Sequence, residues 1–396
     1  MLQQKHILIL HPHFTLSGGA GKFALEVGQR LAKRDYKVSV INMKSKDKLT
    51  LSFPNIRVID VKGPLTSSFL FWLLFPYWYW KVSKMIDMLK PDVLFPQVFP
   101  AQWWALLYKH FHPHMRTVWM CQEPSAFIHS ETWIKAIHSP LKRFIASMIK
   151  NLLAPIDIWL ANKADAVIAN SKFSLEMIQH IYGIDESKLS VAYPGVSDAF
   201  LVQKPETSRE HTVVTVSRLS KFKNIDFLIK TFVKFAEQRK EAWHLHVVGD
   251  GEEKKSLERL VSSLNAQSFI HLAGQLSDQK LSGLLRASTF YLSAAVDEPF
   301  GISLVEAQAS GAIVIAHNSG GPKETIINDK TGKLVDHLDS ELYVQAMNES
   351  LIKNLAVKLS KNAHSHSESF NWNSTTNKVN KVLFPSDKES PPFVFN

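Results

Sequence analysis

Short apolar runs alternate along the chain with segments whose apolar residues return every three or four positions. The first run covers residues 5–10, and the segment that follows, residues 22–33, carries Phe23, Val27 and Leu31 at the spacing of one helix face. Further strands are expected at residues 57–60, 92–95, 117–120, 166–169 and 189–192. Regular alternation of strands and helices predicts a doubly wound parallel sheet in this half of the chain.

A second alternating unit follows a polar, proline-containing segment, residues 201–211, whose composition is typical of a linker. The length of 396 residues also fits two domains better than one. We therefore expect an α/β protein with one Rossmann-like domain over residues 1–200 and another over residues 212–365. The tail, residues 385–396, is rich in proline, serine and charge, which predicts disorder.

One stretch of the second unit reads as strand, loop, helix and strand. The apolar residues 289–293 precede a loop, Gly301 opens the run ISLVEAQAS with the apolar content of a packed helix, and residues 313–316 supply the next strand. Glu298 therefore falls on the loop at the carboxyl end of a strand. Open α/β sheets bind their ligands at that edge.

The start of this helix is a predicted anion site, because the first N–H groups of a helix have no partner within it and favour negative charge. The amides concerned belong to Phe300, Gly301, Ile302, Ser303 and Leu304. Glu306 lies further along, and helical side chains lean toward the N-terminus. Two carboxylates beside one anion suit a ligand whose hydroxyl groups donate to them, such as a nucleotide sugar. The alternative is that both glutamates are ordinary solvated residues.

The segments EPFGISLVE, EAQASGAIVIAHNSGGPKE and TGKLV resemble the donor-site signature of glycosyltransferase family 4, and the resemblance covers nearly the whole chain. It implies the GT-B fold, in which two Rossmann-like domains face a cleft, and transfer of a hexose from a nucleoside diphosphate sugar with retention and without a metal. In this family the counterpart of Glu306 binds the ribose and that of Glu298 contacts the transferred sugar. The amides between them hold the diphosphate.

Other parts of the family pattern assign further residues. The resemblance implies that Gly18 and Gly19 contact the donor diphosphate, and that the loop with Gly274 and Leu276 lies near the base. It also implies that the last helix, predicted over residues 366–384, crosses back onto the first domain. Residues 320–324, GGPKE, resemble mannosyltransferases of the family, which favours mannose.

Arg218 and Lys223 are two cations placed at the end of a strand and the start of the next helix. Cations there neutralise a diphosphate and stabilise its departure, so we predict a catalytic role for both, together with Glu298. In family 4 this pair binds the donor pyrophosphate. The alternative is two solvated basic residues.

Gln122 stands where family members often carry a histidine near the transferred sugar. A glutamine exchanges no proton at neutral pH, but it donates and accepts hydrogen bonds. We therefore expect Gln122 to position sugar or acceptor hydroxyls on the first domain. The alternative is an ordinary loop amide.

The net charge of +10 calls for an anionic partner, and both an anionic lipid and an anionic donor satisfy it. Nucleic acid is not expected, because zinc-finger spacing, an aromatic RNA-binding strand and a basic dimerising helix are all missing from the sequence. Residues 69–84 combine a twelve-residue apolar, aromatic run with lysines, and residues 140–159 mix basic and apolar positions. Both predict a peripheral membrane contact, and core helices are the alternative.

The single cysteine, Cys121, and an amino-terminal segment with few apolar residues predict a cytoplasmic protein, with contact on the inner face of the membrane. The sequence contains no D-x-D pair, so no metal is expected. The expected donor is a GDP- or UDP-linked sugar. The expected acceptor is lipid-linked or an oligosaccharide, in polysaccharide or glycoconjugate synthesis.

Other functions fit the same architecture. A nucleotide-sugar epimerase, a phosphorylase, or a catalytically idle module that binds sugar nucleotides or membranes are the alternatives.

Overall fold

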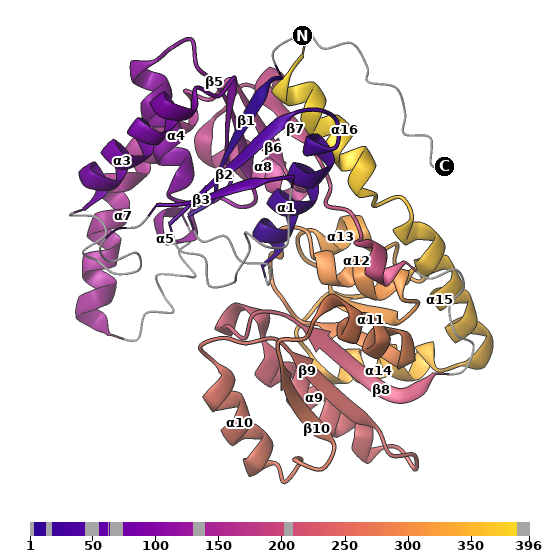
Figure 1. The fold of residues 1–396 in the computed structure, drawn as a ribbon. Coiled ribbons are helices and arrows are strands. Elements are labelled where there is room, and N and C mark those ends of the chain that lie inside the picture. Colours follow the sequence, from indigo (N-terminus) through magenta and orange to yellow (C-terminus); the bar gives the residue numbers. More distant parts are fainter. Residues whose placement is uncertain are drawn as a thin grey trace. The chain divides into compact units, whose positions relative to one another are not determined.

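The computed structural model describes residues 4–12, 18–43, 55–61, 63, 74–129, 139–201 and 209–385. The chain divides into two compact units (Figure 1). Unit 1 holds residues 1–193 and 373–396, and unit 2 holds residues 194–372. The division falls between Tyr193 and Pro194, ahead of the predicted linker. Most of that linker, and the tail beyond residue 385, lie outside the described residues.

Unit 1 contains a seven-stranded sheet in the order β3-β2-β1-β4-β5-β6-β7, and all its strand pairs are parallel. The strands are β1 (His6–Leu10), β2 (Lys37–Asn42), β3 (Arg57–Asp60), β4 (Val93–Pro96), β5 (Arg116–Cys121), β6 (Ala166–Ala169) and β7 (Leu189–Val191). Every residue of β1 is buried, as expected for a strand covered on both faces. The predicted doubly wound parallel sheet is confirmed.

The helices of unit 1 are α1 (Gly19–Ala32), α3 (Phe75–Leu89), α4 (Ala101–Phe111), α5 (Ala126–His129), α7 (Pro140–Ala161), α8 (Lys172–Tyr182) and α16 (Trp372–Leu383), whose first residue belongs to unit 2. The face of α1 that carries Phe23, Val27 and Leu31 is buried, as the spacing predicts. None of the helices in the described parts of the chain has the length and apolar character needed to cross a bilayer.

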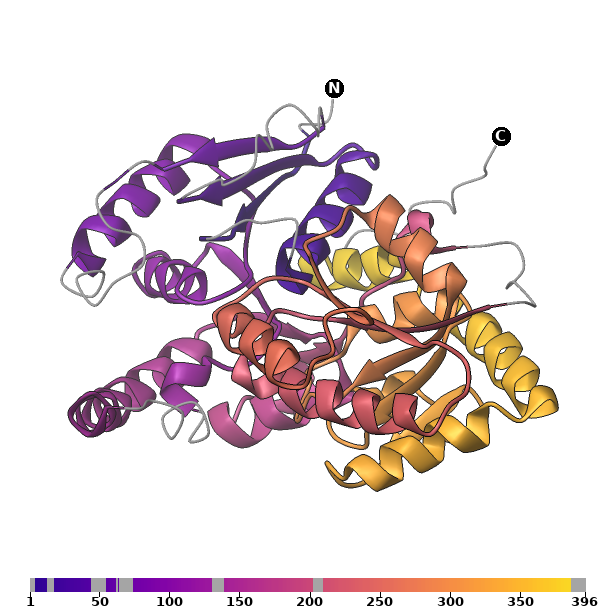
Figure 2. The same cartoon turned by 90° about the horizontal axis from the view of Figure 1, so that it is seen from below.

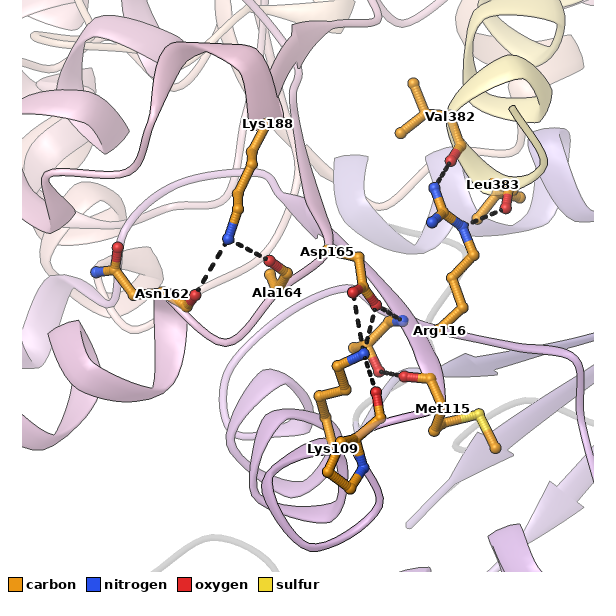
Figure 3. Close-up of polar contacts among 11 residues, drawn as sticks. Lys109, Met115, Arg116, Asn162, Ala164, Asp165, Lys188, Val382 and Leu383 are labelled. Atoms are coloured by element: carbon orange, nitrogen blue, oxygen red, sulfur yellow. Dashed lines mark hydrogen bonds and ion pairs between the residues drawn. The ribbon is translucent and has the colours of Figure 1, made fainter. Parts of the chain in front are cut away.

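The last helix is fixed to unit 1 by its carboxyl end (Figure 3). Arg116 donates from Nε to the carbonyl oxygen of Leu383 and from Nη2 to that of Val382, both at 2.7 Å. These are helix-end carbonyls, which have no partner within the helix. Beside them, the Asp165 carboxylate accepts from Lys109 Nζ at 2.9 Å and from the N–H of Thr117, the second residue of β5, at 2.7 Å.

The sequence predicts one helix over residues 366–384, whereas the structure has a break there. Helix α15 (Lys353–Ser367) ends before α16 begins, and Phe370 turns back by donating its N–H to Ser367 O at 3.0 Å. The carbonyl of Phe370 then accepts from Val196 N at 2.9 Å. This pairing with another segment of unit 2 keeps the chain out of the helical ladder.

Unit 2 contains a six-stranded parallel sheet in the order β10-β9-β8-β11-β12-β13, with helices on both faces (Figures 1 and 2). The strands are β8 (Glu210–Val216), β9 (His244–Val248), β10 (Ile270–Gly274), β11 (Ser288–Ser293), β12 (Ile313–His317) and β13 (Gly332–Val335). The helices, besides α15, are α9 (Ile225–Glu237), α10 (Lys254–Ser263), α11 (Asp278–Ala287), α12 (Ile302–Ala309), α13 (Pro322–Thr325) and α14 (Ser340–Ser350). Its core packs Phe232, Phe235 and Trp243 against Phe290. This is the second predicted Rossmann-like unit.

Candidate active site

The loop between β11 and α12 carries Glu298 to the carboxyl edge of the unit 2 sheet, where the sequence places it. Gly301 is the residue before α12 and has a left-handed backbone, with φ of 86°. Leu304 N donates to Gly301 O at 3.0 Å, so the helix turns directly after the glycine. The helix start therefore lies at the same edge as the Glu298 carboxylate.

A downstream glycine pair shapes this loop. The N–H of Gly321 donates to Glu298 O at 2.7 Å, and a Cβ on Gly320 would lie 2.5 Å from that same oxygen. Ser319 Oγ adds a hydrogen bond from Asp297 N at 3.0 Å and donates to its carboxylate at 2.6 Å. The GGPKE segment thus has a structural task that its resemblance to mannosyltransferases does not reveal, because only glycines permit this contact.

Lys223 meets the Glu298 carboxylate in an ion pair, and the two side chains are about one quarter exposed, at 25% and 22%. Lys223 closes a short 3-10 helix, Lys221–Lys223, after β8, and Asn224 follows in a left-handed conformation that asparagine tolerates. Asn224 Nδ2 donates to Ala294 O at 2.8 Å. This bond ties the loop after β8 to the loop after β11, so a cation and a carboxylate from distant segments come together.

The pair opens onto a depression of about 290 Å³, its mouth included. The lining residues are Thr215, Val216, Ser217, Lys223, Ile225, Tyr291, Ser293, Ala294, Ala295, Glu298, Gly301, Ser303 and Leu304. The hydroxyl of Tyr291 donates to Ser303 Oγ at 2.7 Å and lies 3.1 Å from Val216 O. Burial raises the pKa of Tyr291 well above its usual range, and the charges of Glu298 and Glu306 add to the shift. Tyr291 therefore remains a neutral hydrogen-bond donor.

Arg218 does not line this depression. Its side chain is 75% exposed and donates from Nη2 to Glu252 Oε2 at 3.2 Å. Gly249, after β9, lies against the backbone of Ser217, where a Cβ would overlap the Ser217 carbonyl oxygen, so the segment that leads to Glu252 runs beside Arg218. Glu306 is buried in α12, at 4% exposure, and does not line the depression either. Of the four charged residues expected to converge, the structure places only Lys223 and Glu298 in contact.

The remaining predicted donor residues of unit 2 do not line the depression. Phe300 is buried, so its side chain is not available to a ligand. Ile302 begins α12 and is half-buried. Gly274 ends β10 with φ of 66°, and Leu276 follows it on the loop before α11. Neither of these two lines the depression.

Unit 1 carries the other predicted residues. Gly18 and Gly19 stand at the start of α1, Gly18 in an extended conformation, while residues 13–17 lie outside the described residues. Gln122 follows β5 and accepts a hydrogen bond from Asn170 Nδ2 at 3.2 Å. Among the described residues its buried Nε2 has no partner. An amide held in this way keeps donor capacity for a ligand hydroxyl.

In the described ranges, no group of three or more His, Cys, Asp or Glu side chains is placed to hold a metal ion. His110 packs against Trp159, and His112 stacks on Tyr108 and donates from Nδ1 to Tyr108 O at 3.1 Å. These two histidines therefore have packing roles.

Sequence reasoning did not find eight of the thirteen lining residues, among them Thr215, Ser217 and Tyr291, which carry hydroxyl groups. In the sequence Tyr291 resembles a core residue of a strand, and Thr215 resembles a buried residue of β8. Ser217 resembles the last residue of a strand. Their polar atoms gain meaning only once β8 and β11 are known to be neighbours. The pairing of those strands is the missing signal.

Two units, each with a doubly wound parallel sheet, have the architecture of the GT-B fold class. The HepE protein of Anabaena, solved with UDP and glucose, has this fold and superposes with a TM-score of 0.76, at 21% identity, over 95% of this chain and 98% of that one. At that identity the likeness shows the fold alone.

Two family models also match, "Glycosyltransferase Family 4" over residues 17–200 and "Glycosyl transferases group 1" over residues 197–366. The chain belongs to this glycosyltransferase family.

Two relatives illustrate its neighbourhood. The GDP-Man:Man(3)GlcNAc(2)-PP-Dol alpha-1,2-mannosyltransferase of Xenopus laevis is 29% identical over 211 residues, 49% of this chain and 42% of that protein. The N-acetylgalactosamine-N,N'-diacetylbacillosaminyl-diphospho-undecaprenol 4-alpha-N-acetylgalactosaminyltransferase of Campylobacter jejuni is 26% identical over 335 residues, 83% of this chain and 86% of that protein. The matched part spans about half the length of several relatives.

Proposed function

We propose that the protein transfers a hexose from a nucleoside diphosphate sugar to an acceptor hydroxyl, with retention of configuration and without a resident metal. The observation that carries this proposal is the depression in which Lys223, Glu298 and the start of α12 come together. The GGPKE segment weakly favours mannose, and the donor base is guanine or uracil. The named substrates of the relatives, a GDP-mannose donor and a diphospho-undecaprenol acceptor, support a lipid-linked or oligosaccharide acceptor.

Each charged group has a task in this reaction. As the bond to the sugar breaks, negative charge grows on the diphosphate, and the Lys223 ammonium and the α12 amides stabilise it. Glu298 contacts the transferred sugar, and Glu306 the ribose. Arg218 leaves Glu252 for the diphosphate when the donor binds. An exposed ion pair contributes only about 0–1 kcal/mol, so this exchange costs little.

A donor screen tests the proposal. The protein is first incubated with GDP, UDP and their hexose derivatives in a thermal-shift assay, and then with the stabilising donor and extracted lipid acceptors. A glycosylated product is the expected result. Donor consumption without such a product would identify an epimerase or a hydrolase, and binding without turnover would identify an idle module.

We also propose that helix α7 rests on the cytoplasmic face of an anionic membrane. Its exposed apolar side chains follow one another at intervals of three or four residues, between 40% and 69% exposed: Phe144, Met148, Leu152, Ile156 and Trp159. The helix also carries Arg143 and Lys150, while its one acidic residue, Asp157, is buried. An apolar stripe with basic flanks and no exposed carboxylate complements anionic headgroups.

The other predicted membrane segment contributes less. In α3 the residues Trp78, Val82 and Ile86 are buried in the core of unit 1, and Trp80 is the exposed aromatic residue. Residues 69–73 lie outside the described residues. The core alternative therefore holds for the inner face of α3, and the membrane proposal rests on α7.

Vesicle flotation tests the α7 contact. Wild-type protein is expected to float with vesicles containing one third phosphatidylglycerol at low salt, and less so at high salt. The double variant Met148→Glu/Leu152→Glu is expected to lose at least tenfold in bound fraction. Val357→Glu, at an exposed apolar position of α15, is the matched control. Equal flotation of all three proteins would contradict the proposal.

A further inference from the structure

Ser217 is a buried hydroxyl at the wall of the depression. It follows β8, and its N–H donates to Val248 O at 3.1 Å, which fixes its backbone. Its Oγ is buried and has no hydrogen-bond partner among the described residues. A buried hydroxyl without a partner lowers stability, so its presence beside a ligand site calls for an explanation.

Ser303 brings a second hydroxyl to the same wall from the first turn of α12. Its Oγ lies 2.7 Å from the Tyr291 hydroxyl. Tyr291 lies 3.1 Å from Val216 O, whereas Ser303 reaches that carbonyl only at 3.4 Å. When Tyr291 donates to Ser303 Oγ, the Ser303 proton has only the distant Val216 O as an acceptor in this group and can turn toward a ligand oxygen.

The charges at this wall do not balance a diphosphate. Among the lining residues, Lys223 is the one cation, and it is paired with Glu298. Arg218 is paired with Glu252 outside the depression. A diphosphate brings at least two negative charges and more acceptor oxygens than Lys223 and an incoming Arg218 satisfy, so neutral donors complete its hydrogen bonding.

We infer that the hydroxyls of Ser217 and Ser303 donate hydrogen bonds to the diphosphate oxygens of the donor, and that Tyr291 is a positioning residue for Ser303. The inference rests on the proposed function, because it specifies how that donor is held. It adds two neutral side-chain donors to the lysine and the helix amides. It also explains why Ser217 keeps an unpartnered hydroxyl.

Titration calorimetry with UDP and GDP tests the inference, with uridine and guanosine as competitors that lack the phosphates. Ser217→Ala and Ser303→Ala are each expected to weaken diphosphate binding about tenfold or more, since each removes a hydrogen bond to a charged group, and to leave nucleoside binding unchanged. Tyr291→Phe should lower the ratio of nucleotide to nucleoside affinity in the same sense. A purely structural role would lower both affinities together.

Ser310→Ala is the matched control, because the Ser310 hydroxyl is also buried without a partner among the described residues but lies at the far end of α12. In the absence of ligand, Ser217→Ala should melt at the same temperature as the wild type or higher, since an unpartnered hydroxyl is removed. Wild-type affinity for UDP and GDP in both serine variants would overturn the inference. Lack of nucleotide binding by the wild type would instead overturn the proposed function.

Discussion

At the scale of single residues, the contact between Lys223 and Glu298 links the segment after β8 to the segment after β11. Both side chains are partly exposed, so each remains available to a ligand while the other holds it in place. The charged groups that the depression offers a ligand are therefore a lysine and a glutamate held together.

Lys223→Ala is predicted to lower kcat/KM for the donor at least tenfold, about 1.4 kcal/mol, because it removes the one cation of the wall. Lys221→Ala is the control, since Lys221 is exposed on the same short helix and does not line the depression. Steady-state kinetics with the donor found in the screen provide the measurement. Equal losses in the two variants would show a general charge effect.

Arg218 and Glu252 form an ion pair, but substitutions of the two residues are expected to have opposite effects on the rate. Arg218→Ala should lower kcat/KM at least tenfold, about 1.4 kcal/mol, if the guanidinium turns to the diphosphate. Glu252→Ala should leave the rate equal or raise it, because it frees the arginine from an exposed pair of little stability. The same kinetic assay measures both. An unchanged rate in Arg218→Ala would restrict the site to Lys223 and the helix amides.

At the scale of elements, an arginine and an aromatic stack hold the carboxyl end of α16. Arg116 donates to two carbonyls at the end of that helix. Tyr36 also stacks on Phe384 just beyond it, with ring centroids 5.2 Å apart. Arg116 and Tyr36, which both lie far from α16 in the sequence, thus hold its carboxyl end.

Arg116→Ala is predicted to loosen the last turn of α16 and to lower the free energy of unfolding by about 1–3 kcal/mol, since two helix-end carbonyls lose a charged donor. Hydrogen exchange read by mass spectrometry should show faster exchange in the carboxyl-terminal half of α16. Arg259→Ala, on the exposed side of α10, serves as the control. Unchanged exchange in α16 would mean that stacking and packing alone retain it.

Much of the fold was predictable because strands covered on both faces are apolar throughout, as in β1, and because α1 repeats its apolar residues at helical spacing. The break between α15 and α16 was not predictable, since no glycine or proline marks residues 368–371 and the break depends on pairing with Val196.

The candidate site was predictable where local sequence decides it, as at Gly301 and Glu298. It was not where distant segments decide it. The close approach of Gly249 to the Ser217 backbone brings the segment that leads to Glu252 beside Arg218, and no residue near Arg218 in the sequence predicts that pairing.

At the scale of the whole molecule, histidines of both units make folding depend on pH. Burial lowers the pKa of His6 in β1 and of His246 in β9, with additional lowering from Lys37 and from His271 and His244 respectively. Burial likewise lowers the pKa of His366. The unfolded chain therefore binds more protons than the folded chain below the ordinary histidine pKa of 6.5.

Because the folded pKa values are the lower ones, stability is fully present above pH 6.5 and declines as the pH falls below it. The melting temperature is thus predicted to decrease between pH 7 and pH 5. In His246→Gln this decrease should be smaller, because one of the groups that favours the unfolded state in acid is gone. Thermal melts across that range at constant ionic strength provide the measurement, and parallel curves for both proteins would contradict the assignment to His246.

Gly320 and Gly321 also limit which segments of this protein can be exchanged with those of a relative. The backbone at Glu298 packs directly against those two glycines. The loop that carries Glu298 and the GGPKE segment therefore form one structural unit, although α12 and β12 lie between them in the sequence. Replacing only the Glu298 loop with that of a relative would disturb its backbone contact with Gly320 and Gly321. A chimera that replaces this loop therefore has to replace residues 294–325 together.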